Sequence, residues 1–266
     1  MPSRRAQKTP RPNSRLGSSP SVAAVLRHNR PLRRLLAAWL QSCLGTGAGY
    51  VALLLLTYRY LHTSWAIAAV LLCEFLPQIA LGSPFGALAD RHSKRRLIVI
   101  ANLLQAVAFA GLALAHTAVP ILGLALLAGL GNALQRPALR SALPDVAGGQ
   151  IQVAAALYDT CRWIGLTAGP VIAAGLFALS DVALPLALNG LSFLIAAAVI
   201  ATIGFGASPN PASPHAARSS GVRAGLSEAL AAWPAVAAVL ACSAGWIVGA
   251  GMLNVCEPIL ARRVLH

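Results

Sequence analysis

The sequence predicts an all-α membrane protein, and composition is the first of two observations that predict it. Of the 266 residues, 57% are hydrophobic and only 11% are charged, whereas about 25% of the residues in an ordinary soluble domain are charged. The mean hydropathy is +0.69. So few charges cannot give a soluble protein of this length a polar surface.

The second observation is a series of apolar runs, each about as long as the 20 residues that cross a bilayer as a helix. We predict seven spans: Leu35–Tyr58, Trp65–Ala89, Leu97–Ala115, Val119–Leu139, Val153–Leu179, Val182–Phe205 and Trp233–Leu260.

The segments outside these spans divide the chain into four parts. Residues 1–30 are rich in Arg, Ser and Pro, a composition that cannot bury a core, so we predict a disordered basic tail. Residues 31–205 hold the first six spans. Residues 206–225 combine Ala, Pro and Ser and are typical of a mobile linker. Residues 226–266 carry the seventh span.

The charges predict the orientation. The formal net charge is +14, and nine of the 21 Lys and Arg residues precede the first span. We interpret this tail as a topology signal rather than a nucleic-acid arm. With the N-terminus in the cytoplasm, most other basic residues lie on the inner side, as the positive-inside rule requires: Arg91, Lys94, Arg95, Arg96, Arg136, Arg140, Arg218 and Arg223. Arg59 lies outside, and Arg262–Arg263 is an exception. We predict a multi-pass protein of the cell (inner) membrane.

Residues that support enzymatic chemistry are scattered. The six histidines lie in tails or turns and form no cluster for metal binding or acid–base work. The five cysteines are far apart, and an odd number argues against a disulfide framework. The sequence has no phosphate loop of the Gly-x-x-x-x-Gly-Lys-Ser/Thr type. We predict no enzyme, no cofactor and no metal; an integral membrane enzyme is an alternative that would need a polar cluster at one interface.

A charged stretch between the second and third spans follows the pattern Gly-x-x-x-Asp-Arg-x-x-x-Arg-Arg, from Gly86 through Asp90 to Arg96. It resembles the signature loop between helices 2 and 3 of the major facilitator superfamily, whose members are secondary transporters with two six-helix halves. The resemblance implies the N-terminal six-helix half of that fold plus one further transmembrane helix. It also implies a gating loop that latches the halves in the outward-facing state, made by Gly86, Asp90, Arg91, Lys94 and Arg95.

The physical chemistry of this loop fits a latch. Asp90 lies at the C-terminal end of a helix, where the helix dipole disfavours a negative charge and neighbouring basic residues offset that cost. Gly86 follows Gly82 by one turn and gives a small-residue packing face. Ser93 stands where the family usually has glycine, and serine avoids positive φ, so we expect a slightly different loop geometry. The alternative is a plain positive-inside anchor.

A second stretch, Gly165-Leu-Thr-Ala-Gly169-Pro170, lies in the fifth span. It resembles the Gly-x-x-x-Gly-Pro-x-x-Gly-Gly pattern of exporters in the superfamily, with Ala173 and Ala174 in place of the last glycines. Gly165 and Gly169 allow close helix packing, and Pro170 removes a backbone hydrogen bond and bends the helix. The alternative is ordinary small-residue packing.

Two further stretches, Gly131–Asp145 and Leu260–Leu265, resemble the branch that includes the enterobactin exporter. The resemblance covers the chain from about Arg33 to its end, and it implies twelve helices. We therefore expect a chain truncated after helix 7. Such a chain would not transport by itself, or would associate with another copy.

Polar residues inside the predicted spans are the candidate site, since burying them in a membrane is costly unless they find partners or serve transport. Glu74 and Gln78 lie one turn apart in the second span, and burial favours the protonated carboxyl, as a proton carrier or cation site requires. A structural glutamate bonded to a neighbouring helix is the alternative. Asp159 and Arg162 are three residues apart, a spacing that favours a structural pair. Other polar residues are expected to join helices: Gln41, Asn102, Gln105, Asn132, Asn189 and Asn254.

These patterns predict a transmembrane secondary transporter, namely an ion-coupled efflux permease for small molecules such as drugs or siderophores. Its partners are the lipid bilayer, a small-molecule substrate and a coupling proton, with no nucleic acid. The second hypothesis is a non-transporting truncated remnant or subunit, which a missing second half favours.

Overall fold

The computed structural model describes residues 22–205, together with residues 241, 244–245 and 249. The described part of the chain is helical, without strands. Its helices are α1 (Val22–His28), α2 (Arg30–Leu61), α3 (Ser64–Arg91), α4 (Lys94–Leu112), α5 (Ala118–Val146), α6 (Ile151–Phe177) and α7 (Ala183–Ala201). The six helices from α2 to α7 are long and apolar enough to cross a membrane. This confirms the all-α membrane fold.

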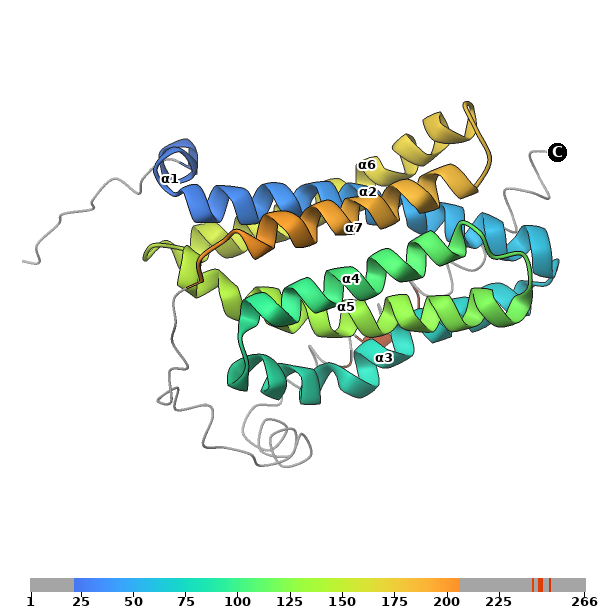
Figure 1. Cartoon of the computed structure of the whole chain (residues 1–266), viewed down its shortest axis with the longest axis horizontal. Coiled ribbons are helices and arrows are strands. Elements are labelled where there is room, and N and C mark those ends of the chain that lie inside the picture. The colour runs from blue at the N-terminus through green and yellow to red at the C-terminus, as the bar shows by residue number, and fades with distance from the viewer. Residues whose placement is uncertain (1–21, 206–240, 242–243, 246–248, 250–266) are drawn as a thin grey trace, which may run out of the picture.

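The six long helices lie side by side (Figure 1). α2 packs against α6 and α7, α4 packs against α7 and α5, and α5 packs against α3. Helices α3 and α6 therefore end this series and are the least covered. In the most apolar 18 residues of each helix, only 22% of the positions in α3 and 17% in α6 are buried, against 44% to 56% in the other four helices. Both helices keep a free face within the described part of the chain.

Glycines bring α2 and α6 into backbone contact. A Cβ atom on Gly47 would meet the backbone of Gly165 and Gly169, and a Cβ atom on Gly165 would fall within 3.0 Å of the Cys43 backbone. About two turns nearer the start of both helices, Trp39 stacks on Tyr158 with ring centroids 4.8 Å apart, and its Nε1 donates to the Tyr158 carbonyl at 3.1 Å. These contacts hold α6 against α2 although little of the α6 surface is buried.

Buried amides join α4 to α5. Gln105 Nε2 donates to Gln135 Oε1 at 2.9 Å, and Gln135 Nε2 donates to Asn102 Oδ1 at 3.1 Å. Between α2 and α7, Gln41 Nε2 donates to the Ser192 carbonyl at 2.6 Å. In a medium without water these bonds satisfy polar groups that would otherwise be costly. Asn102, Gln105 and Gln41 thus join helices as expected.

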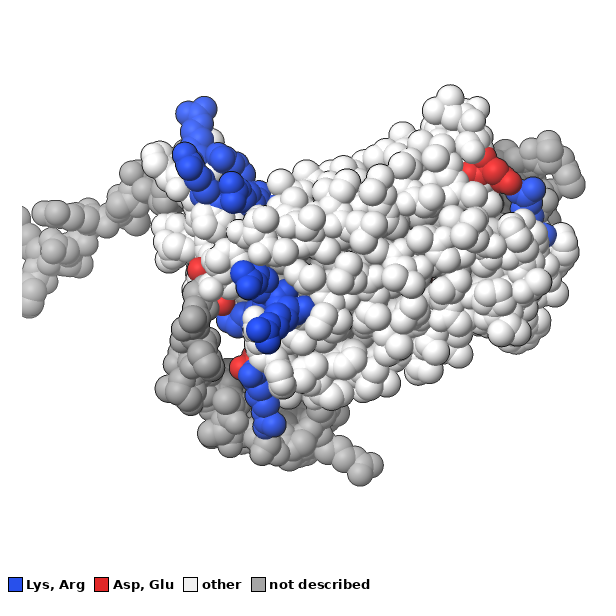
Figure 2. All heavy atoms as spheres, viewed as in Figure 1, with Lys and Arg blue, Asp and Glu red and all other residues white. Residues whose placement is uncertain are grey.

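Charged side chains gather at the two ends of the bundle, with an uncharged face between them (Figure 2). At one end Lys94 Nζ lies 2.8 Å from Asp145 Oδ2. At the other end Arg59 pairs with Asp181, which lies in the connection between α6 and α7. The Val182 N–H, and then the Arg59 side chain, hold the pKa of Asp181 below its usual range. An uncharged face between charged ends is the arrangement that a bilayer requires.

The structure corrects two boundaries. Residues 22–28 belong to the tail predicted to be disordered, yet they form α1, because Val25 is buried in the hydrophobic cluster that also holds Val146 and Ala147. Helix α5 was predicted to end at Leu139 but continues to Val146, about two turns further. The linker 206–225, and the seventh span apart from four residues, lie outside the described residues.

Candidate functional site

Glu74 is the most deeply buried charged residue of the described part, with 7% of its surface exposed. It lies about ten residues, or about 15 Å, along α3 from Ser64. Gly129 of α5 touches the α3 backbone here, since a Cβ atom on it would fall within 3.0 Å of the Glu74 carbonyl. Glu74 Oε2 has no hydrogen-bond partner among the described residues. An isolated buried carboxyl is therefore held between two closely packed helices.

Gln78, which was predicted to share the site with Glu74, forms its side-chain hydrogen bond within its own helix. Gln78 Nε2 donates to the Glu74 backbone carbonyl at 3.1 Å. That carbonyl is one turn earlier in α3, and Pro77 and Pro84 interrupt the backbone bonding of this helix. Gln78 thus supports the helix beside Glu74, and its amide does not satisfy the carboxyl.

Tyr50 of α2 is a second buried group without a partner. Its hydroxyl makes no hydrogen bond within the described residues, and it interacts electrostatically with Glu74. Tyr50 lies about eleven residues before α2 ends, and Glu74 about ten after α3 begins, so the two side chains come from the same level of the bundle.

Arg136 of α5 lies further inside its helix than the predicted span allowed. It was assigned to the inner membrane face because the fourth span was taken to end at Leu139. Since α5 continues to Val146, Arg136 lies about 15 Å inside the helix end. Its Nε donates to Asn132 Oδ1 at 3.2 Å, and it interacts electrostatically with Glu74 and with Arg162 of α6. The one-turn spacing of Asn132 and Arg136 was the sequence feature that could have indicated that Arg136 lies within the helix.

Asp159 and Arg162 do not form the pair that their spacing predicted. Asp159 Oδ1 lies 3.7 Å from Arg140 Nη2 on α5, so Asp159 forms its ion pair with a neighbouring helix. The Arg162 guanidinium lies 5.9 Å from the centroid of the Trp163 ring. Arg162 has no ion-pair partner within the described residues. We call Tyr50, Glu74, Arg136 and Arg162, from four different helices, the central polar set.

The predicted gating loop is a tight turn of His92 and Ser93 between α3 and α4. Ser93 has a φ of −61°, so this position is extended and serine is not strained there. Lys94 holds the loop to α5 through Asp145, and only 19% and 15% of these two side chains are exposed. Asp90 is exposed and has no ion pair with any described residue.

The glycines beside the loop face open space. Cβ atoms placed on Gly82 or Gly86 would have nothing within 4 Å among the described residues. Their small-residue face is therefore not used for packing within these six helices. It is available on the uncovered side of α3.

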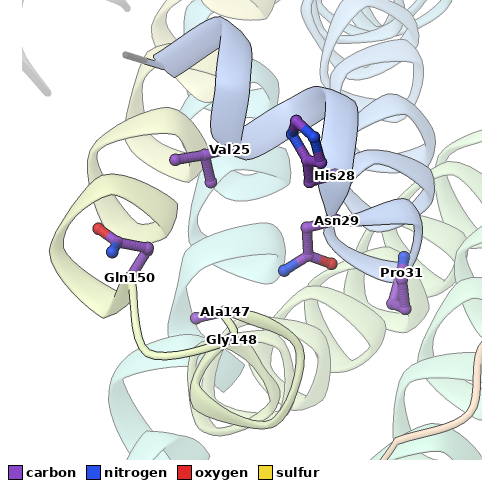
Figure 3. Close-up of a pocket in the computed structure, with 7 residues that line it drawn as sticks. All are labelled: Val25, His28, Asn29, Pro31, Ala147, Gly148 and Gln150. Atoms are coloured by element: carbon purple, nitrogen blue, oxygen red, sulfur yellow. The ribbon is translucent and has the colours of Figure 1, made fainter. Parts of the chain in front are cut away.

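A surface pocket of 440 Å³ lies at the end of the bundle that holds α1 and the α5–α6 connection (Figure 3). Asn29 lies at its centre, where Nδ2 donates to the Val146 carbonyl at 2.6 Å and Oδ1 accepts from Leu32 N–H at 3.0 Å. Gly148 has a φ of +57°, a left-handed turn that glycine adopts without strain. Asn29 thus caps two helix ends. The pocket lies at a helix end, apart from the central polar set.

The described residues contain no group of three or more His, Cys, Asp or Glu that could hold a metal ion.

The family follows from a comparison with known proteins. The sequence model described as Major Facilitator Superfamily matches residues 35–261, which is most of the chain. The chain belongs to the major facilitator superfamily. No curated protein matches it. Members of the major facilitator superfamily are typically membrane transporters rather than enzymes, so this member is a multi-pass membrane transporter, in contact with the lipid bilayer and with a small-molecule substrate. The resemblance seen in the loop from Gly86 to Arg96 is confirmed at the level of the superfamily.

Proposed function

We propose that this transporter is an ion-coupled efflux permease for small molecules such as drugs or siderophores, akin to the branch that includes the enterobactin exporter. Glu74 carries the proposal. A buried carboxyl with a free oxygen inside a membrane helix is costly to keep and is typical of ion pathways. Glu74 takes up a proton when its site faces one side and releases it when the site faces the other.

The contact between α2 and α6 supports the change of access. Gly165 and Gly169 lie against α2 without intervening side chains, and Pro170 interrupts the backbone bonding of α6. A close, smooth contact beside a flexible point suits a helix that rocks during transport. We propose this stretch as the exporter feature of the chain.

The loop from Gly86 to Arg95 serves as the gate in this proposal. Lys94 anchors the loop to α5 through Asp145, while Asp90 and Arg91 remain exposed. Asp90 is therefore available to a second group of helices, and the N-terminus, with its basic residues, lies in the cytoplasm of a cell (inner) membrane protein. The candidate proton or substrate site comprises Glu74, Gln78, Asp159 and Arg162.

A specific observation favours a second candidate function, a subunit that does not transport alone. The described helices leave faces of α3 and α6 uncovered, and two-half carriers bind substrate between the halves. In that case a second body of helices, from another copy or another chain, completes the site.

Gradient-driven flux from vesicles distinguishes the efflux permease from the non-transporting subunit. The full chain is reconstituted in lipid vesicles, a pH gradient is imposed, and the efflux of amphipathic dyes of different charge is measured against protein-free vesicles. Efflux that disappears when the gradient is collapsed supports the permease. No efflux at any protein density contradicts it and favours the non-transporting subunit.

A further inference from the structure

We propose that the central polar set binds an acidic group, such as a carboxylate or phosphate, and that Arg136 is the residue that holds it. This inference rests on the proposed function and specifies the substrate class of the site that includes Glu74 and Arg162. An acidic group of the transported molecule and the headgroup of an anionic lipid share this chemistry, and the experiment below distinguishes them.

The balance of charge within the central polar set is the first argument. Two of its members are guanidinium groups, those of Arg136 and Arg162, and they interact with each other electrostatically. Arg140 is compensated by Asp159. Glu74 forms no ion pair within the described residues, although it lies within electrostatic range of Arg136. The site thus has more positive than negative groups, and a charge in a membrane interior is stable only with a partner.

The hydrogen bonding of Arg136 is the second argument. Its Nε donates a hydrogen bond to Asn132 Oδ1 at 3.2 Å, and this bond fixes the plane of the guanidinium. The two terminal nitrogens make no hydrogen bond to any described residue. A guanidinium held at one edge presents a planar fork, and a carboxylate or phosphate accepts two parallel bonds from such a fork.

The position of Arg162 is the third argument. Arg136 and Arg162 each lie about eleven residues or fewer from the α5–α6 connection, so they lie at similar depth. Both are half-buried, which leaves access for a ligand. Two like charges near one another raise the affinity for an anion placed between them. Arg162 therefore supports the binding that Arg136 directs.

Binding of matched aromatic compounds tests the proposal. The purified full chain in nanodiscs of phosphatidylcholine is titrated calorimetrically with benzoate, phenyl phosphate, uncharged benzamide and cationic benzylamine, which share one ring and differ in charge. We expect the two acids to bind more tightly than the others. Arg136→Gln raises the Kd of the acids about tenfold to a hundredfold. Arg136→Lys keeps the charge without the fork and has an intermediate effect. Arg59→Gln, which removes a charge at the far end, leaves the Kd unchanged.

Three results would overturn the proposal: tighter binding of benzamide or benzylamine than of the acids, no binding of either acid, or an unchanged Kd in Arg136→Gln. If Arg136→Gln does not fold, Arg162→Gln and Arg136→Lys carry the test, and an unchanged Kd in both counts against it. The ion-driven flux described above is judged separately, so flux of cationic dyes without acid binding leaves the permease standing.

A second arm identifies the source of the acidic group. The titrations are repeated in nanodiscs that contain phosphatidylglycerol. Acid binding that is unchanged there supports a site for a dissolved substrate. Acid binding that is lost there assigns Arg136 to an anionic lipid headgroup and overturns the substrate assignment.

Discussion

Adding one methyl group to the contact between α2 and α6 should destabilise the protein. In Gly165→Ala the new Cβ would meet Cβ, C and O of Cys43 within 3.0 Å. Two of these are backbone atoms that cannot rotate away, so α6 has to move off α2. Gly175→Ala is the matched control, because it lies in the same helix and its Cβ would have nothing within 4 Å among the described residues.

The size of the effect follows from two terms. Both variants gain the helix preference of alanine over glycine, about 1 kcal/mol. Only Gly165→Ala bears the cost of overpacking, about 1–3 kcal/mol, to which the neighbouring Trp39–Tyr158 stack and hydrogen bond add about 1 kcal/mol if they loosen. We therefore expect Gly165→Ala to unfold about 3 kcal/mol more easily than Gly175→Ala.

Equilibrium unfolding of the purified proteins in a mild detergent, by titration with a denaturing detergent and followed by circular dichroism, measures this difference. If Gly165→Ala were as stable as Gly175→Ala, the direct backbone contact between α2 and α6 would be refuted.

Three further predictions concern the ends of the helices. Asp145→Asn should lower the stability by about 2 kcal/mol, since it removes a largely buried charged partner of Lys94; a double-mutant cycle with Lys94→Gln should then show a coupling, and additive losses would contradict the ion pair. In a cysteine-free background, Ser93→Cys should resist a membrane-impermeant thiol reagent in intact cells and react in inverted vesicles; strong labelling of intact cells would reverse the proposed topology. Because the pKa of Asp181 is lowered in the folded state, its stabilisation is present above about pH 4 and is lost as the pH falls further. Thermal unfolding at decreasing pH should show a loss that is smaller in Arg59→Gln, and identical profiles would exclude the Asp181 contribution.

Local patterns were sufficient for the membrane helices. Apolar length alone predicts α2, α3, α4, α6 and α7 to within a few residues, because the bilayer demands both length and apolarity. Hydropathy failed at the end of α5, where Arg140 and Asp145 interrupt the apolar run. These two residues are compensated by Asp159 and Lys94, so the helix continues through them.

Partners on other helices could not be read from the sequence. The spacing of Asp159 and Arg162 is correct for a pair on one helix, but the geometry between α5 and α6 brings Arg140 nearer to the carboxyl. The boundary error at Leu139 likewise concealed the depth of Arg136. The burial of Glu74 could be predicted from the sequence, because a carboxyl within an apolar run is conspicuous without any knowledge of its neighbours.

The most direct test of the proposed mechanism is the pH dependence of flux with and without the Glu74 carboxyl. Wild type and Glu74→Gln are reconstituted in vesicles, with enough protein for copies to associate, and dye efflux is measured over a series of imposed pH gradients. Asp181→Asn, which removes an exposed carboxylate in the connection between α6 and α7, serves as the control, and its flux should still respond to the gradient. Wild-type flux should rise with the gradient, whereas flux through Glu74→Gln should not respond to it. A Glu74→Gln protein whose flux follows the pH gradient as the wild type does would contradict the account.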